Sequence, residues 1–325
     1  MADSTRVGVI VGRERAFPDA LIERINEKGG GDITAEMARL GAIRMDATIP
    51  YRVVVDRISH EVPFYRAYVD KAVAGGAIVI NNPFWWTADN KFVECVIAGQ
   101  LGVNVPRTVL VPNRSYEADI IDESLRNLEM PPNWEEMTAY TGLPAVLKPA
   151  WGGGSKNVSV VRSLDELQAA WEQSGHLQMI LQEFIDYENY ARCFVIGREH
   201  VLISGYDYSA PYFERYRQDT RLSPALHDLI TDHCLALTRA LGYDMDTVEF
   251  AIRDGVPYAI DFLNPAPDCE PASVKQWNFD WVVDRLSDLV IRYAREESLE
   301  PPDPTAAALT SFVPALTGVV ESVTG

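Results

Sequence analysis

Three segments of the sequence carry groups suited to binding phosphate and metal ions. The first is a glycine-rich stretch, Lys148 to Lys156, between two segments that we expect to be β-strands. Consecutive glycines at 152–154 let the backbone approach a ligand and direct several N–H groups to one side. Lys148 could neutralise a phosphate there, or the segment could be a hairpin tip with an exposed lysine. The spacing does not match the P-loop pattern.

The second segment is a predicted β-hairpin over residues 247–263 that turns at Asp254-Gly255. If the loop has three residues, Glu249 lies opposite Asp261 on one face of the hairpin. Opposed carboxylates repel each other unless cations lie between them, and Mg²⁺ prefers oxygen ligands. A two-residue loop would place the two carboxylates on opposite faces. The pattern therefore indicates either a metal site or an acidic pair exposed to solvent.

The third segment is an apolar strand, expected at 179–185, that ends in polar residues. Its end could offer backbone groups to an adenine, and Glu188 could bind a ribose. Taken alone, this pattern is not specific.

Strands alternate with helices over the first hundred residues. We expect strands at 6–11, 51–55 and 77–80, and helices at 18–28 and 64–74. This alternation predicts an open α/β sheet.

The remainder of the chain mixes strands and helices in an order typical of α+β structure. The polar, proline-containing stretch 113–141 predicts short surface helices. The further expected strands are 107–111, 145–149, 158–162, 190–196 and 200–206, and the further expected helices are 90–99, 164–173, 224–241 and 279–295.

Composition limits the class of protein. The chain has 325 residues, which suggests about two domains, and 47% hydrophobic residues exclude wholesale disorder. The charge of 29 − 47 = −18 disfavours nucleic acids and anionic membranes as partners. Four isolated cysteines are typical of reduced thiols and predict a cytoplasmic protein. The longest uncharged run, 304–320, is too short and too polar to span a membrane.

In this order the segments resemble the ATP-grasp superfamily, in particular ribosomal-protein glutamate ligases and bacterial glutathione synthetases. Gln182-Glu183-Phe184-Ile185 and the stretch 191–197 are similar to the family's hinge and the strand that follows it. The resemblance covers roughly residues 91–297. It implies an N-terminal open α/β domain and a two-part ATP-grasp module, with a small lid and a larger C-terminal subdomain. The implied boundaries are 1–90 for the first domain, 91–298 for the module with its lid at about 142–185, and 299–325 for a C-terminal tail.

The resemblance also implies a site that binds ATP with Mg²⁺ or Mn²⁺. The implied ATP-binding residues are Lys91, Lys148, Gly152, Gly153, Gly154, Ser155, Gln182, Glu183, Phe184, Ile185 and Glu188. The implied metal ligands are Glu249, Asp261 and Asn264, and Arg192 and Arg217 would contact the transferring phosphoryl group or the substrate carboxylate.

Two features depart from the family. The residues before Glu249, at 244–247, include no arginine, which some relatives use as an oxyanion donor. The family also has asparagine two residues after the acid. Asn264 is three residues after Asp261, so a bulge near Leu263 or a bend before Pro265 would be needed to bring both to the metal.

These inferences together favour an ATP-dependent ligase that joins a carboxylate to an amine through an acyl phosphate. The substrates would be amino acids, peptides or other small molecules, and Arg57, His60, Glu61, Tyr65 and Trp85-Trp86 are either near their binding site or part of core or interdomain packing. An ATP-grasp kinase, a thiol-forming ligase and a non-catalytic nucleotide-binding module stay open, as does a homodimer. A dinucleotide oxidoreductase is disfavoured, because the stretch 11–15 lacks the GxGxxG turn.

Overall fold

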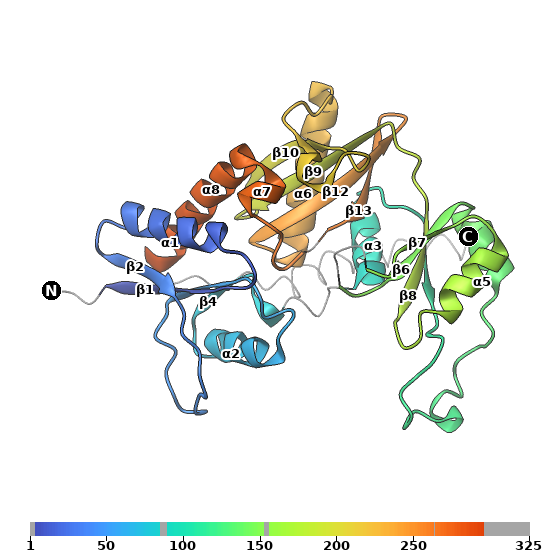
Figure 1. Ribbon diagram of the computed structural model, residues 1–325, viewed down its shortest axis with the longest axis horizontal. Helices are drawn as coiled ribbons and strands as arrows, with labels where there is room; N and C mark the ends of the chain where they lie inside the picture. Colours follow the sequence, from blue (N-terminus) through green and yellow to red (C-terminus); the bar gives the residue numbers. More distant parts are fainter. Residues whose placement is uncertain (1–3, 85–89, 153–155, 263, 296–325) are drawn as a thin grey trace, which may run out of the picture. The chain divides into compact units, whose positions relative to one another are not determined.

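The computed structural model describes residues 4–84, 90–152, 156–262 and 264–295 (Figure 1). The chain forms two compact units that are not contiguous in sequence. The first takes in residues 1–87, 189–249 and 262–325, and the second takes in 88–188 and 250–261. The domain boundaries expected from the sequence follow the family's subdomains and stay a prediction.

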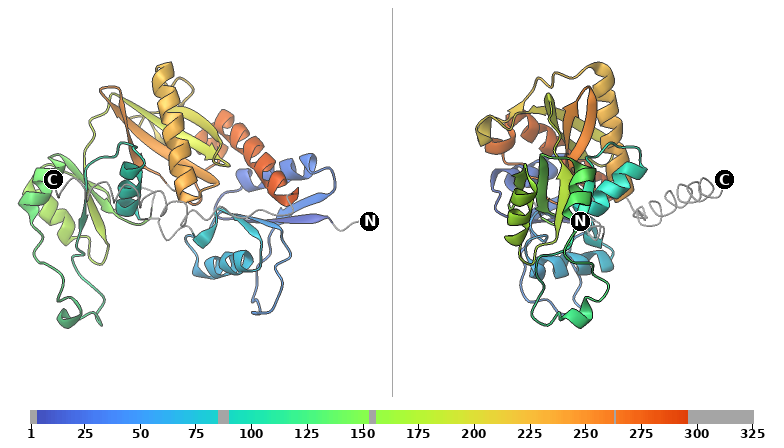
Figure 2. Two further views of the ribbon diagram at one scale, coloured as in Figure 1. Left: turned by 180° about the vertical axis from the view of Figure 1, so that it is seen from behind. Right: turned by 90° about the vertical axis from the view of Figure 1, so that its right-hand side faces the viewer.

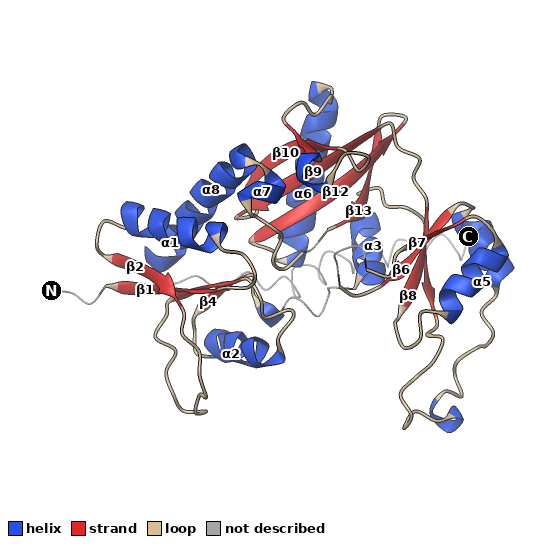
Figure 3. Cartoon of the chain, viewed as in Figure 1, coloured by secondary structure: helices blue, strands red, loops and turns tan. Residues whose placement is uncertain are grey.

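The first unit contains a parallel sheet with the strand order β2-β1-β3-β4. Helices α1 and α8 cover one face of this sheet, and α2 covers the other (Figures 1 and 3). The expected open α/β sheet is confirmed. The bounds are β1 Thr5–Ile10, α1 Ala16–Lys28, β2 Ile33–Met37, β3 Val53–Asp56, α2 Pro63–Ala74, β4 Ile78–Ile80 and α8 Gln276–Arg295.

Sequence reasoning missed β2. The strand has five residues, lies at the edge of the sheet, and carries Thr34 and Glu36 between apolar residues. It therefore lacks the continuous β-branched run that marks β3, in which all four residues are buried.

A second, five-stranded sheet has the order β11-β10-β9-β12-β13. Helix α6 packs against β9 and β10 (Figure 2). Ser223 begins α6 by accepting a hydrogen bond from the Leu226 amide, and Gly242 ends it with a φ of 74°. The bounds are β9 Asn189–Ile196, β10 His200–Tyr206, η3 Tyr212–Glu214, β11 Tyr216–Arg217, α6 Pro224–Leu241, β12 Met245–Arg253, β13 Val256–Asp261 and α7 Pro271–Val274.

The loop of the β12–β13 hairpin has fewer than three residues. Only a three-residue loop would place Glu249 and Asp261 opposite each other on one face. β12 ends at Arg253 and β13 begins at Val256, with only Asp254 and Gly255 between them. Their φ angles of 54° and 72° fit a type I′ turn, whose twist matches that of the flanking strands. The register proposed for Glu249 and Asp261 from the sequence is therefore wrong, and their assignment needs other support.

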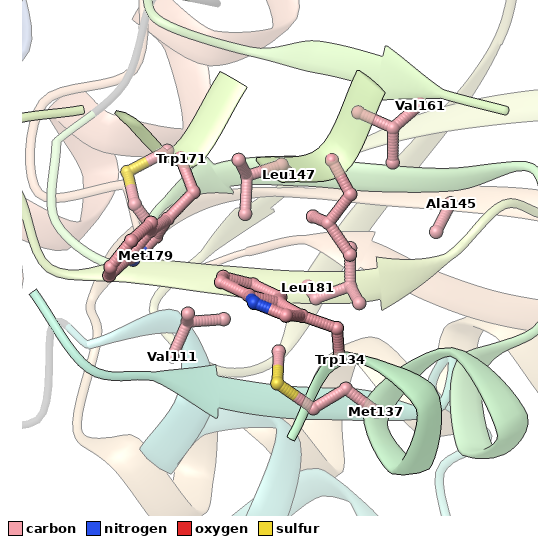
Figure 4. Close-up of a cluster of buried hydrophobic side chains, with 10 residues drawn as sticks. Val111, Trp134, Met137, Ala145, Leu147, Val161, Trp171, Met179 and Leu181 are labelled. Atoms are coloured by element: carbon pink, nitrogen blue, oxygen red, sulfur yellow. The ribbon is translucent and has the colours of Figure 1, made fainter. Parts of the chain in front are cut away.

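The second unit is built on an antiparallel sheet with the order β5-β8-β6-β7. Its core lies beneath α4 and α5, where Trp134 and Trp171 pack edge to face around Leu147 and Leu181 (Figure 4). The bounds are α3 Lys91–Gln100, β5 Thr108–Val111, η2 Asp122–Ser124, α4 Trp134–Thr141, β6 Ala145–Pro149, β7 Ser159–Val161, α5 Leu164–Glu172 and β8 Met179–Glu183.

Candidate functional site

Lys148 lies near the end of β6, an inner strand of the antiparallel sheet of the second unit. Its side chain is buried, and Nζ donates a hydrogen bond to the Ile260 carbonyl at 3.1 Å. Removing an ammonium group from water is costly unless a negative or strongly polar group faces it. The Lys148 ammonium group, near the end of a strand, is therefore well placed to bind an anionic ligand.

Lys91 occupies the first position of α3. The preceding residue, Asn90, caps the helix by accepting hydrogen bonds from the amides of Phe92 and Val93. The Lys91 amide donates to the Ala150 carbonyl at 2.9 Å, which fixes the helix start against the end of β6. Lys91 Nζ donates to the Gly152 carbonyl at 2.8 Å.

Lys91 also meets a carboxylate. Its Nζ lies 3.3 Å from Asp261 Oδ1, at the end of β13. Lys148 contacts the residue just before, Ile260, so both lysines and Asp261 converge within the second unit. The structure thus brings together three residues that the resemblance placed in one site.

The expected lid loop is described only in part. Gly152 has a φ of 82°, a backbone conformation that favours glycine. Gly153, Gly154 and Ser155 lie outside the described residues, so their role stays a prediction.

The side chains of Gln182 and Glu183, which the resemblance placed in the hinge, contact neighbouring elements of the second unit. Gln182 is buried and donates to Thr108 Oγ1 at 3.0 Å, across the β5–β8 ladder. Glu183 lies 3.0 Å from Arg107 and 3.1 Å from Arg253. Burial raises the pKa of Glu183, but the hydrogen bonds from the two arginines outweigh this and lower it, so the carboxylate stays ionised.

The polypeptide beyond β8 holds the remaining candidates for adenine and ribose binding. Phe184 and the buried Ile185 follow the strand without regular structure, which leaves a backbone-mediated adenine contact as a prediction. The Glu188 carboxylate accepts hydrogen bonds from the amides of Asp254 and Gly255 at 3.3 and 3.2 Å. Its partners in this structure are therefore turn amides, and ribose binding stays a prediction.

Glu249 lies in the first unit, on β12, among tyrosines. Its Oε2 accepts hydrogen bonds from the hydroxyls of Tyr190 at 2.6 Å and Tyr208 at 2.7 Å. Its Oε1 lies 3.4 Å from Nε of Arg192. Burial, followed by the charge of Glu249, raises the pKa of both phenols, so both remain donors.

Arg192 is enclosed by aromatic rings. Its guanidinium lies 5.5 Å from the ring centre of Tyr206 and 5.8 Å from that of Tyr216, and the side chain is 18% exposed. Burial lowers the pKa of the guanidinium, but Glu249 more than compensates and raises it well above its usual value. Arg192 is therefore a permanent cation that already faces one candidate metal ligand.

Two further predicted residues have local partners. Arg217 pairs with Asp207 and is about half exposed. The backbone N–H of Asn264 donates to the buried Asp246 carboxylate at 2.8 Å. The side-chain oxygen Oδ1 of Asn264 accepts a hydrogen bond from the backbone N–H of Ala266. Leu263 lies outside the described residues, so the bulge expected there is untested.

Sequence reasoning missed Tyr190 and Tyr208. One signal could have revealed the first, because residues two apart on a strand share a face and Tyr190 precedes Arg192 by two. The register of the neighbouring strands adds residues to the same face: Arg192 pairs with Ser204, Tyr206 lies two residues beyond Ser204, and Tyr206 pairs with Tyr216. Tyr208 follows β10 in a loop, where no periodicity applies.

A cavity of about 260 Å³ opens in the first unit, beyond the ends of β1 and β3. Arg57, His60 and Glu61, which the sequence singled out for substrate binding, line it with Glu14 and Asp268. The Arg57 guanidinium is buried and makes two hydrogen bonds of 2.8 Å to the Glu14 carboxylate. Burial lowers the pKa of His60, which keeps its ring neutral at pH 7.

Within the described part of the chain, no group of three or more His, Cys, Asp or Glu side chains is arranged to hold a metal ion. A metal ion would therefore need ligands from the nucleotide or water in addition to the acids identified above. No described helix is long and apolar enough to cross a membrane, and Cys95, Cys193, Cys234 and Cys269 are buried free thiols.

Solved structures resemble the whole described architecture. A RimK-domain ATP-grasp protein from Sphaerobacter thermophilus superposes with a TM-score of 0.63 over 87% of this chain and 98% of its own, at 18% identity. D-alanine–D-alanine ligase from Bacillus anthracis, complexed with ATP, gives 0.62 over 90% and 97%, at 16% identity. The chain has the ATP-grasp fold. The ATP-grasp ligase PsnB, solved with its minimal precursor, Mg and ADP, gives 0.60 at 14% identity, over 90% of this chain and 99% of PsnB.

Curated proteins are similar to this chain in sequence over only part of its length. D-alanine–D-alanine ligase from Ralstonia nicotianae is 26% identical over 187 residues, which are 52% of this chain and 56% of the relative. Pyruvate carboxylase from Bacillus subtilis is 24% identical over 152 residues, which are 42% of this chain and 13% of that protein. The chain thus spans about half or less of the length of these curated relatives. No family model matches the sequence.

Proposed function

We propose that this protein is an ATP-dependent, ADP-forming ligase that joins a carboxylate to an amine through an acyl phosphate. The observation that carries the proposal is the convergence of Lys91 and Lys148 on the end of β13, where Asp261 lies. Two fixed cations beside a carboxylate form a donor set that suits phosphates bound together with a divalent cation.

The residues present fit ATP with Mg²⁺ or Mn²⁺. Lys148 and Lys91 would neutralise phosphate oxygens, and the amides beyond β8 would contact the adenine. Asp261 and Glu249 are each proposed to supply a carboxylate oxygen; because the two-residue hairpin loop does not place them on one face, this assignment rests on the resemblance to the ATP-grasp superfamily, as does that of Asn264 as a third ligand. When bound, the cation neutralises charge on the phosphates and favours transfer of the γ-phosphoryl group.

The chain's own residues would contribute mainly position and charge. Arg192 is a permanent cation next to Glu249 and would orient the phosphoryl group or the substrate carboxylate. Arg217 is proposed for the same anionic groups. Transfer of the phosphoryl group to the substrate carboxylate gives an acyl phosphate and ADP, and attack by an amine then releases phosphate and forms the amide.

The cavity beside Arg57 is the proposed substrate site. It presents both signs of charge: the cationic residues are Arg13 and Arg57, and the acidic residues are Glu14, Glu61, Asp268 and Glu270. Such a lining suits a zwitterion, so we propose amino acids or short peptides as substrates. A kinase or a nucleotide-binding module would share the ATP site and differ in its products.

The test is cation-dependent ADP release over a panel of amino acids and dipeptides, with Glu249→Gln and Asp261→Asn as variants. Each substitution keeps the side-chain shape, but Glu249→Gln removes the carboxylate that faces the buried Arg192, so the fold of both variants is checked by circular dichroism. ADP formation should fall by about two orders of magnitude or more. Glu199→Gln, which alters an exposed carboxylate paired with Arg292, is the matched control and should behave as wild type. Wild-type turnover by both site variants would show that the metal assignment is wrong.

A further inference from the structure

We propose that Tyr190 and Tyr208 are positioning residues that fix the Glu249 carboxylate so that one oxygen, Oε1, is presented to a divalent cation. The inference rests on the proposed function, since it requires Glu249 to be a metal ligand. It goes beyond that function by assigning a role to residues that neither the motifs nor the proposed chemistry uses.

The hydrogen bonds distinguish the two carboxylate oxygens. Tyr190 and Tyr208 both donate to Oε2, at 2.6 and 2.7 Å. A carboxylate oxygen has about two lone-pair sites, so two phenols occupy the acceptor capacity of Oε2. Oε1 faces Arg192 at 3.4 Å. Of the two oxygens, Oε1 is therefore the one that a cation can use.

The two hydroxyls are held by packing and by the sheet. Tyr190 is buried on β9, and its ring meets that of Tyr208 edge to face, with 5.0 Å between centroids. Tyr206 packs against both rings, at 6.1 and 5.0 Å. On its other side, Tyr208 carries the Arg215 guanidinium 5.2 Å from its ring centre. Tyr190 is held by burial, and Tyr208, which is 39% exposed, is held by its ring contacts with Tyr190 and Tyr206.

This arrangement has two consequences for the carboxylate. With Oε2 occupied, Glu249 is restricted to single-oxygen coordination and cannot chelate a cation with both oxygens. A cation at Oε1 would also compete with the Arg192 guanidinium for the same oxygen. Binding of the cation would then release a buried arginine to pair with an anionic group of the nucleotide or the substrate, which couples the two binding events.

The experiment measures how Mg²⁺ affects nucleotide binding, with no turnover required. The affinity for AMP-PNP, a non-hydrolysable ATP analogue, is measured by calorimetry without Mg²⁺ and over a Mg²⁺ series. The protein forms are wild type, Tyr190→Phe, Tyr208→Phe, Glu249→Gln and Tyr212→Phe. Tyr212→Phe is the matched control, because the Tyr212 hydroxyl also donates to a carboxylate, that of Asp268, in the same unit.

We expect Tyr190→Phe and Tyr208→Phe to raise the Mg²⁺ concentration needed for half-maximal effect about tenfold. Their affinity for AMP-PNP without Mg²⁺ should stay within about twofold of wild type, as should both readouts for Tyr212→Phe. Tyr208 is only partly buried, so Tyr208→Phe tests the inference even if Tyr190→Phe does not fold.

Two results would overturn the inference alone. One is an unchanged Mg²⁺ dependence in both tyrosine variants when Glu249→Gln is impaired. The other is an equal loss of affinity with and without Mg²⁺, which indicates a general structural defect. An unchanged Mg²⁺ dependence in Glu249→Gln would instead remove the metal assignment of the proposed function, and the inference with it.

Discussion

At the scale of single residues, the sequence was most informative about charge. Lys148 was identified from its position beside a glycine loop and Lys91 from the resemblance to the ATP-grasp superfamily, and both lie together in the second unit. Their partners could not be predicted. The carbonyl that accepts the hydrogen bond from Lys148 belongs to Ile260, which is 112 residues away in the sequence. Such a contact depends on how β6 packs against the β12–β13 hairpin.

Lys148→Met tests the proposed phosphate contact. Methionine has a similar length and suits a buried position, so the fold should persist, whereas the charge is lost. A hydrogen bond to a charged group contributes about 1.5–3 kcal/mol, so affinity for AMP-PNP should fall about tenfold or more, as measured by calorimetry. Lys71→Met is the control, because Lys71 also donates to a backbone carbonyl but is exposed. Equal affinity in the two variants would exclude Lys148 from the nucleotide site.

At the scale of elements, the order of strands and helices was largely predictable, but local geometry was not. The β12–β13 hairpin was expected, yet its loop has two residues rather than three. The Asp-Gly dipeptide itself favours a two-residue type I′ turn. Turn preference therefore predicts the loop length better than the expected pairing of Glu249 with Asp261. The edge strand β2 was missed because it lacks a continuous β-branched run, and β11 because it has only two residues.

Substitutions at two glycines of the second unit test the turn. Gly255 has a φ of 72°, where an L side chain is strained by about 1–2 kcal/mol, so Gly255→Ala should destabilise the protein by about that amount. Gly99 lies within α3, and a Cβ there would meet no atom within 4 Å. Gly99→Ala should therefore leave stability unchanged or raise it by up to about 1 kcal/mol. Urea unfolding measures both, and equal stabilities would contradict the assigned turn.

At the scale of the whole molecule, composition and alternation of elements predicted the fold class. The parallel sheet follows from short β-branched strands separated by helices, whereas the lid was expected only from the resemblance to the ATP-grasp superfamily. The division into units could not be predicted, because each unit draws on separate stretches of the chain. Local patterns show where a strand forms, whereas the joining of 189–249 to the first 87 residues depends on contacts between distant segments.

The central claim is that the protein activates a carboxylate by transferring phosphate to it. The most direct test uses a substrate from the ADP-release panel labelled with oxygen-18 in its carboxylate, with hydroxylamine in place of the natural amine. The described site offers fixed cations and carboxylates for charge neutralisation, so activation should occur on the substrate itself. We predict one hydroxamate per ADP and one labelled oxygen in each phosphate released. ADP-forming turnover in which the label stays wholly in the carboxylate would contradict the account.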